Sequence, residues 1–357
     1  MKKSIFCGNV EIGGESPVSI QSMTNTDTRD VEATIGQIMT LERAGCQIVR
    51  LAVPDMEAAE AFGKIKRKTH IPLVADIHFD YRLALKAMDE GADKIRINPG
   101  NIGSEDGVRK IAAMAGRLGI PIRVGVNSGS LERDILEKYG RATAEGLAES
   151  ALRNVGMLEK YDFDNIVISL KSSDVKMNFD AYRLVNEKSG YPLHIGVTEA
   201  GTLERGKVKS AVGIGALLLE GIGDTMRISL TADPVEEVIF AKEILAAAGL
   251  RKESIEIVSC PTCGRTEVDL QRIVNEIESR LAGIEKKSKA AIKIAVMGCA
   301  VNGPGEARDA DIGVACGVGK GVIFAGGEIV KTVKEEEIAD EIIKMAEEYE
   351  KNTGEFC

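Results

Sequence analysis

Eight short apolar segments, each followed by a longer stretch with helical periodicity, constrain the fold of this chain more than any other feature. The expected strands cover residues 18–23, 47–53, 72–78, 94–98, 121–127, 165–171, 193–199 and 225–230. Helices are expected between them, among others at 31–44, 55–68, 81–90, 105–118, 203–220 and 234–248. Eight strand–helix units in about 250 residues predict a TIM barrel. A doubly wound open sheet is the alternative, but it would more naturally stop at about five to seven strands.

The regular alternation ends near Gly249, which predicts a second domain. We therefore expect an α/β chain with a TIM (β/α)8 barrel over residues 1–249 and a small α+β domain over residues 250–357. The second domain should contain strands near 255–258, 292–296, 311–315 and 321–324, and helices at 267–281 and 335–349. Residues 4–14 read as a hairpin that is closed by Gly13 and Gly14 and could plug the barrel floor.

The composition argues against a nucleic-acid-binding, a membrane-spanning or a secreted protein. The net charge of -9 argues against a broad surface for nucleic acid or an anionic membrane, so local cations must hold any anionic ligand. No apolar run reaches the roughly 18 residues needed to span a bilayer, and no secretory leader is recognisable. Seven cysteines, an odd number, argue against a secreted disulfide framework. We expect a soluble cytoplasmic enzyme.

Several expected barrel strands carry polar and apolar side chains in strict alternation. In the segment KIRIN, for example, Lys94, Arg96 and Asn98 share one face and the isoleucines take the other. Because the apolar face must pack on the helices, the polar face should look into the barrel. The polar candidates near the C-terminal ends of the strands, where barrel enzymes keep their active sites, are Arg50, Arg96, Asn98, Arg123, Asn127, Lys171, Arg227 and Ser229.

Five of these candidates are cations, and unpaired cations inside a barrel cost several kcal/mol each. Arginine forks suit phosphate oxygens, so the convergence of cations indicates a multiply anionic ligand such as a diphosphate. The alternative is an internal salt-bridge network with carboxylates such as Asp76 and Glu199, although the carboxylates expected on the inner face are fewer than the cations.

Three further side chains are candidates for proton transfer or for orienting the cations. Asp76 and His78 lie on one face at the end of the third strand, where such a pair can bind a metal or move protons. Glu199 ends the seventh strand and is expected to face inward, as an acid or base or as a partner of Lys171. His194 falls on the opposite parity from Glu199 and is expected to be structural.

Three cysteines of the second domain indicate a metal site. Cys260 and Cys263 form a C-x-x-C pair, and Cys299 comes from a separate loop. Cys316 could complete a structural zinc site; otherwise the fourth ligand is unusual, exchangeable or absent, as in an iron–sulfur cluster with one accessible iron. Cys7, Cys46, Cys316 and Cys357 have no paired spacing, and we expect most of these four thiols to be inert packing or surface residues.

The motifs resemble the bacterial 4-hydroxy-3-methylbut-2-enyl diphosphate synthase family. The resemblance rests on CPTCGR and GCAVNGPGE after a barrel with IVRLAVPD, ADIHFD, KIRINPGNIG, RVGVNSGS, ISLKSS and VTEAG, and it covers nearly the whole chain. It implies a 4Fe-4S cluster held by Cys260, Cys263, Cys299 and Glu306. It also implies reductive ring opening of 2-C-methyl-D-erythritol 2,4-cyclodiphosphate, with electrons from flavodoxin or ferredoxin.

The resemblance assigns further roles. The barrel cations, with Asn98, Asn127 and Ser229, would hold the cyclic diphosphate; Glu199, with Asp76 and His78, would handle protons. Family members form head-to-tail homodimers in which each cluster domain caps the partner's barrel, and we expect the same here. Two other classes stay open: a barrel hydrolase or transferase with a structural zinc tail, and an electron carrier or cluster-delivery protein.

Overall fold

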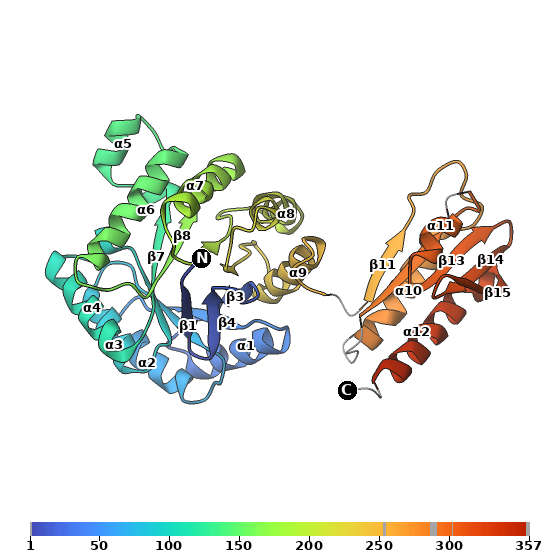
Figure 1. Cartoon of the computed structure of the whole chain (residues 1–357). Helices are drawn as coiled ribbons and strands as arrows, with labels where there is room; N and C mark the ends of the chain where they lie inside the picture. Colours follow the sequence, from blue (N-terminus) through green and yellow to red (C-terminus); the bar gives the residue numbers. More distant parts are fainter. Residues whose placement is uncertain (1, 253–254, 286–290, 302, 355–357) are drawn as a thin grey trace. The chain divides into compact units, whose positions relative to one another are not determined.

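The computed structural model describes residues 2–252, 255–285, 291–301 and 303–354. The chain separates into two compact units, Met1–Arg251 and Lys252–Cys357 (Figure 1). The division falls two residues beyond the boundary expected from the sequence. Each unit has its own hydrophobic core, so the two are described separately.

The first unit is a parallel eight-stranded sheet with the strand order β8-β7-β6-β5-β4-β3-β10-β9. A parallel bridge between Ile168 and Leu193 joins the two ends of this order, so the sheet curls into a barrel. The strands are β3 (Ser19–Met23), β4 (Ile48–Ala52), β5 (Leu73–Asp76), β6 (Lys94–Ile97), β7 (Ile122–Asn127), β8 (Ile166–Lys171), β9 (His194–Ile195) and β10 (Thr225–Met226). The predicted TIM barrel is confirmed, and the open sheet is excluded.

Helices surround the barrel strands (Figure 1). Side-chain oxygens cap most of them at the N-terminus; Asp30 and Asp55, for example, accept hydrogen bonds from Ala33 and Ala58. The helices are α1 (Val31–Arg43), α2 (Met56–Lys66), α3 (Tyr81–Asp89), α4 (Glu105–Leu118), α5 (Arg133–Tyr139), α6 (Ala144–Glu159), α7 (Val175–Lys188), α8 (Leu203–Leu219) and α9 (Pro234–Ala247). Most apolar residues of the strands pack against these helices, which leaves the polar residues inside the barrel.

The hairpin of β1 (Ser4–Cys7) and β2 (Val10–Gly13) closes the floor of the barrel. Its buried residues Ile5, Cys7 and Ile12 form a cluster with Ile48, Val74 and Val167, which come from three barrel strands. The expectation that Gly13 and Gly14 close the hairpin was wrong. The turn lies at residues 8–9, where Gly8 has a φ of 58°, a left-handed conformation that glycine adopts readily.

The second unit is a five-stranded sheet with the order β11-β12-β13-β14-β15. Its strands are β11 (Ile255–Ser259), β12 (Ile292–Met297), β13 (Ile312–Gly317), β14 (Lys320–Ala325) and β15 (Glu328–Lys334). The helices are α10 (Leu270–Glu285), α11 (Gly303–Arg308) and α12 (Ile338–Gly354). The first three strands are parallel and the last two antiparallel. The α+β architecture is confirmed; β15 and the short α11 were not expected.

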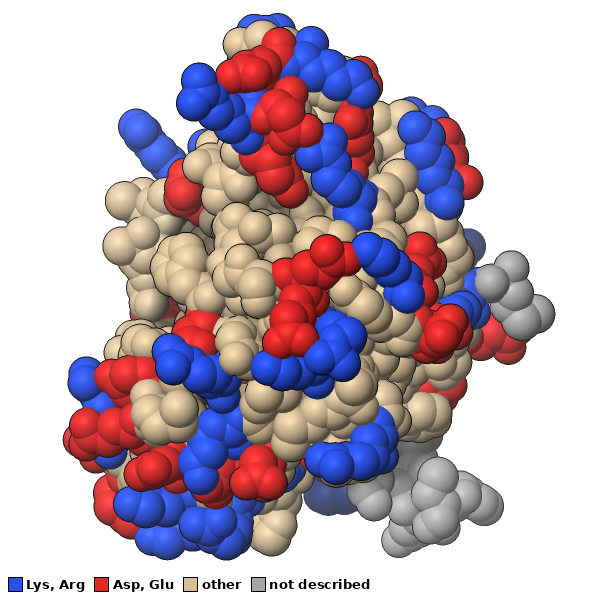
Figure 2. Space-filling model, turned by 90° about the vertical axis from the view of Figure 1, so that its left-hand side faces the viewer, with Lys and Arg blue, Asp and Glu red and all other residues tan. Residues whose placement is uncertain are grey.

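Positive and negative side chains are interspersed on the face of the molecule drawn in Figure 2. The drawn face therefore shows no large area of a single charge sign. Among the surface ion pairs of the first unit, Lys138 lies 2.6 Å from Glu149 and Arg153 lies 2.6 Å from Asp134. Within the described ranges, no helix is long and apolar enough to cross a membrane.

Candidate functional site

The C-terminal ends of the barrel strands form a pocket with a cavity of about 130 Å³. Most of the barrel residues that the sequence singled out lie around it. The lining residues are Arg50, Asp76, His78, Arg96, Arg123, Asn127, Ser169, Lys171, Thr198, Arg227 and Ser229. The strand alternation therefore brings these side chains to one place, as expected from their parity.

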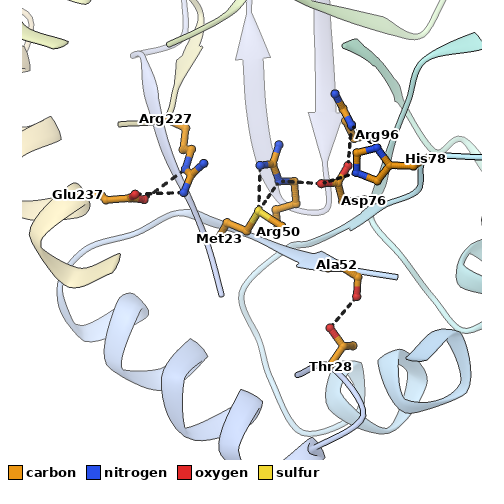
Figure 3. Close-up of polar contacts among 9 residues, drawn as sticks. All are labelled: Met23, Thr28, Arg50, Ala52, Asp76, His78, Arg96, Arg227 and Glu237. Carbon is orange, nitrogen blue, oxygen red and sulfur yellow. Dashed lines mark hydrogen bonds and ion pairs between the residues drawn. The ribbon is translucent and has the colours of Figure 1, made fainter. Parts of the chain in front are cut away.

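Asp76 is the buried carboxylate at the centre of one group of cations (Figure 3). Its Oδ1 lies 3.1 Å from Arg96 Nη1, and its Oδ2 lies 3.6 Å from Arg50 Nε and 3.7 Å from His78 Nε2. Burial acts to raise the pKa of this carboxyl, but the charge of Arg50, a hydrogen bond from His78 and the charge of Arg96 hold it well below its usual value. Asp76 is therefore ionised and orients cations.

Arg227 has a second buried carboxylate as its partner, Glu237 of α9 (Figure 3). The guanidinium donates from Nε to Oε2 at 3.2 Å and from Nη2 to Oε1 at 3.1 Å. Arg50, besides its contact with Asp76, donates to the Met23 sulfur at 3.1 Å from Nε and 2.9 Å from Nη2. The salt-bridge alternative is therefore correct for three of the five cations: Asp76 is the partner of Arg50 and Arg96, and Glu237 is the partner of Arg227.

Arg123 and Lys171 are the least compensated cations of the mouth. Arg123 is 1% exposed, and within the described part of the chain its Nε and Nη1 have no hydrogen-bond partner. Burial and the neighbouring charges of Arg50 and Arg96 place the pKa of Arg123 well below its ordinary value. Burial and the charge of Arg227 do the same for Lys171. An anion in the pocket would reverse both shifts, so the arrangement suits an anionic ligand.

Two glycines make room for these long side chains. A Cβ at Gly125 would lie 2.6 Å from Arg96 Nε, and a Cβ at Gly196 would lie 2.6 Å from the Arg227 carbonyl oxygen and 3.2 Å from Lys171 Nζ. Both glycines therefore face the barrel interior and leave space that any other residue would fill. The need for glycine at these two positions could not be predicted from the sequence, because the side chains and backbone that require the space come from neighbouring strands.

Two barrel candidates lie outside the pocket lining. Asn98 is buried, and its Oδ1 accepts a hydrogen bond from the Gly100 backbone at 3.1 Å, so it caps the short helical turn that follows β6. Glu199 is exposed and has a φ of 51°, in the left-handed region. The expectation that Glu199 faces inward by strand parity was wrong.

The error at Glu199 has a structural cause. Regular pairing of β9 ends at Ile195, and Gly196 and Thr198 are the residues of this segment that face the interior. The same alternation puts His194 on the inner side, contrary to its expected parity. Burial and the charges of Arg123 and Lys171 lower the pKa of His194 well below its ordinary value, so it is a neutral residue of the barrel interior.

The candidate metal ligands lie in the second unit. Strands β11 and β12 pair in parallel with Ser259 opposite Val296, so Cys260 and Cys299 follow these strands at the same edge of the sheet. The Gly298 backbone donates to Cys260 Sγ at 3.2 Å, and the Glu267 backbone donates to the Gly298 carbonyl at 3.1 Å. The two cysteine loops are therefore held together by hydrogen bonds.

Cys263 is exposed, and hydrogen bonds from the backbone and side chain of Arg265 lower the pKa of its thiol. Glu306 lies exposed on α11, the helix that follows the Cys299 loop. Among the described residues, no three His, Cys, Asp or Glu side chains are close enough to enclose a single metal ion. In a four-iron cluster each ligand binds a different iron, so the ligands stand farther apart than around one ion.

Cys7, Cys46 and Cys316 are buried. Burial raises the pKa of Cys7 to about 11, of Cys46 to about 12 and of Cys316 to about 12. A buried thiol that stays protonated is a poor metal ligand, since the thiolate is the binding form. Cys357 lies outside the described residues.

Sequence reasoning missed three residues at the mouth: Glu237, Met23 and Thr198. Glu237 is an acidic residue in the first turn of α9, where it reads as a helix-stabilising charge, and only the fold shows that it is 3% exposed behind Arg227. Met23 ends β3 and reads as an ordinary core residue. Thr198 could have been predicted, because it lies two residues after Gly196 and so shares its face of the strand.

The fold and the two groups of residues define a class: a TIM-barrel protein with a cationic mouth, followed by a small α+β domain that gathers cysteines at one sheet edge. The chain belongs to the GcpE family, since the GcpE TIM-barrel domain matches residues 2–242 and the GcpE protein C-terminal domain matches residues 256–348.

Curated relatives match almost the whole chain. A protein of Ruminiclostridium cellulolyticum is 61% identical over 97% of this chain and 97% of its own length, and one of Clostridium perfringens is 58% identical over 97% and 98%. A protein of Caldanaerobacter subterraneus is 56% identical over 97% of both chains. All three are named 4-hydroxy-3-methylbut-2-en-1-yl diphosphate synthase (flavodoxin).

Among solved structures, dihydropteroate synthase from Stenotrophomonas maltophilia matches with a TM-score of 0.49 and 14% identity, over 66% of this chain and 94% of that one.

Proposed function

We propose that this protein is an iron–sulfur oxidoreductase that opens the ring of 2-C-methyl-D-erythritol 2,4-cyclodiphosphate and gives 4-hydroxy-3-methylbut-2-enyl diphosphate. The name and the full-length identity of the relatives support this assignment. They do not support the alternative of a hydrolase or transferase with a structural zinc tail. The observation that carries the proposal in this chain is the cationic mouth, where Arg123 and Lys171 stand largely uncompensated in a pocket of about 130 Å³.

The barrel residues bind and orient the substrate. Arg123 and Lys171 attract the diphosphate, and Arg50, Arg96 and Arg227 contact it from positions that the two buried carboxylates fix. Asn127 and Ser229 line the same pocket and add hydrogen bonds, and within the described residues Ser229 Oγ has no other partner. Asn98 supports this surface indirectly, because it holds the turn after β6.

Two groups can exchange protons with a ligand at the mouth. The His78 side chain is 58% exposed, and its ring lies between Asp76 and Arg96, with Nε2 on the carboxylate side. Glu199 stands exposed next to the lining residue Thr198, on a backbone in the left-handed region. We assign proton handling to His78 and Glu199. Asp76 holds His78 and the arginines in place.

Cys260, Cys263 and Cys299, with Glu306, would hold a 4Fe-4S cluster. Three cysteine sulfurs and one carboxylate fit the donor chemistry of such a cluster, and the backbone hydrogen bond to Cys260 Sγ is of the kind that stabilises a thiolate. When bound, such a cluster would supply electrons one at a time. The reaction would take up two electrons and two protons: the C–O bond of the ring opens with its oxygen kept by the diphosphate, and a hydroxyl group leaves as water while the C=C bond of the product forms.

We further propose that flavodoxin or ferredoxin delivers the electrons, that the enzyme works in the cytoplasm, where thiols stay reduced, and that it assembles as a head-to-tail homodimer. The name of the relatives supports flavodoxin as donor. The topology supports the dimer: α9, like every barrel helix, runs back toward the floor, so the chain leaves the barrel at the end opposite the mouth.

The test is anaerobic purification with iron and sulfide analysis, followed by turnover of the cyclodiphosphate with a chemical reductant. We expect a four-iron cluster and conversion to the linear diphosphate. A protein that holds zinc instead of iron and sulfide would favour the hydrolase or transferase. A protein with an intact cluster that leaves the cyclodiphosphate unchanged would sink the proposal and favour an electron carrier.

A further inference from the structure

Glu237 makes more contacts at the mouth than the salt bridge with Arg227 requires. Its Oε2 also accepts from Ser22 Oγ of β3 at 3.3 Å, and its Oε1 accepts from the Leu230 backbone after β10 at 3.0 Å. Glu237 is 3% exposed, so these bonds fix both carboxylate oxygens in a site that water barely reaches. With the two hydrogen bonds from Arg227, each carboxylate oxygen of Glu237 accepts from two donors.

The contacts set the orientation of Arg227. Glu237 engages Nε and Nη2 of the guanidinium, so Nη1 is the nitrogen available to a ligand in the pocket that Arg227 lines. Figure 3 shows Glu237 on the side of Arg227 away from Arg50 and Asp76, so the carboxylate lies behind the cation instead of competing with a ligand for the pocket.

Glu237 also sets the formal charge of the mouth. In the described residues, five lining cations face two buried carboxylates, Asp76 and Glu237, which leaves a surplus of three positive charges. Asp76 is shared between Arg50 and Arg96, whereas Glu237 compensates Arg227 alone. Loss of the Glu237 charge would therefore raise the surplus to four without removing any cation.

The charge of the ligand changes in the proposed reaction. Each phosphorus of a cyclic diphosphate carries one strongly acidic oxygen, so the ring form is a dianion at neutral pH. Opening the ring frees a terminal phosphate whose second ionisation has a pKa near 6, so the linear product approaches a trianion. A pocket with a greater positive surplus would favour the product over the substrate.

Resting on the proposed function, we propose that Glu237 is a specificity-determining residue: its buried charge limits the positive surplus of the mouth, so that the pocket discriminates in favour of a cyclic diphosphate dianion and releases a linear diphosphate. Glu237 acts through Arg227 and does not itself touch the ligand. Its loss should therefore change the ratio of two affinities, which the loss of a merely structural salt bridge would not do.

The experiment measures dissociation constants for the cyclodiphosphate and for inorganic pyrophosphate on the full-length, anaerobically reconstituted protein without reductant, so that no turnover occurs. In Glu237→Gln, we expect the affinity for pyrophosphate relative to the cyclodiphosphate to rise about tenfold, as one missing charge at close range in a partly buried site allows. Glu236→Gln is the matched control, because it removes the same charge from the neighbouring position of α9 and leaves the pocket lining intact.

A double variant keeps the test decisive if Arg227 becomes disordered in Glu237→Gln. Arg227→Gln with Glu237→Gln removes one cation and one anion, so the surplus returns to that of the wild type, and the affinity ratio should return with it. An unchanged ratio in Glu237→Gln, or a shifted ratio that persists in the double variant, would overturn the inference. Failure of the proposed function would look different, because the wild-type protein would then bind pyrophosphate but not the cyclodiphosphate.

Discussion

At the residue scale, we expect the buried Lys171 to lower the stability of the free protein and to strengthen the binding of an anionic ligand. Its ammonium is almost fully buried among arginines, and burial and the charge of Arg227 place its pKa well below the ordinary 10.5. In Lys171→Met we expect the free protein to be more stable by about 1–4 kcal/mol, because a buried charge is replaced by a side chain of similar volume. Binding of the cyclodiphosphate should be lost. Thermal unfolding and titration calorimetry measure the two effects.

The destabilising effect of Lys171 should also appear in how the free energy of unfolding depends on pH. The unfolded chain binds a proton at Lys171 more tightly than the folded protein does, so stability rises with pH between the lowered pKa and 10.5. Lys171→Met should flatten this rise, whereas Lys188→Met, which changes an exposed lysine at the end of α7, should leave it unchanged. If Lys171→Met destabilises the free protein, the charge is compensated by groups that we have not assigned.

Glu306 differs in chemistry from the other three proposed cluster ligands, because a carboxylate exchanges more readily than a thiolate. We expect Glu306→Ala to lose most of the iron and sulfide after anaerobic reconstitution, or to hold a cluster with altered absorption, and to lose turnover. Asp309→Asn is the control: it removes an exposed carboxylate just after the same helix. An intact cluster and full activity in Glu306→Ala would remove this residue from the site.

At the scale of strands and helices, the mouth depends on the absence of a side chain on β7. A Cβ at Gly125 would press on the Arg96 guanidinium, which cannot move without weakening its 3.1 Å contact with Asp76. We expect Gly125→Ala to weaken binding of the cyclodiphosphate about tenfold or more, the effect of losing one charged hydrogen bond. Gly156→Ala on α6, where a Cβ meets nothing within 4 Å, should not change binding. Equal affinities in the two variants would contradict this packing argument.

The same strands show what a sequence can predict. On β6, β7 and β8, which contain four to six residues each, alternation alone identified the inner face near the mouth, because the isoleucines, valines and leucine of the other face pack on the helices. On β9 regular pairing covers two residues, and the backbone then turns to a positive φ at Glu199, so alternation no longer describes which side a residue faces. Glu237 was missed because its role depends on a helix that packs behind a strand, a contact that no local pattern contains.

At the scale of the whole molecule, the cationic mouth and the three cysteines belong to different compact units. The proposed function requires that the two groups come together in the working enzyme. The barrel helices run from mouth to floor, so the linker to the second unit starts at the end of the barrel opposite the mouth. The head-to-tail dimer that we propose would give both mouths a cysteine domain, because a closed two-fold assembly uses each interface twice.

Complementation between two inactive variants tests this arrangement. Cys260→Ser removes a candidate cluster ligand but keeps the barrel, and Arg123→Met removes a mouth cation but keeps the cysteines. In random dimers of equal amounts, half the molecules are mixed, and each of these has one site with an intact barrel and an intact partner domain. We expect about a quarter of wild-type activity from the co-expressed pair and almost none from either variant alone. If each barrel worked with its own second domain, no site in the mixture would be complete, and activity would stay at the level of the single variants.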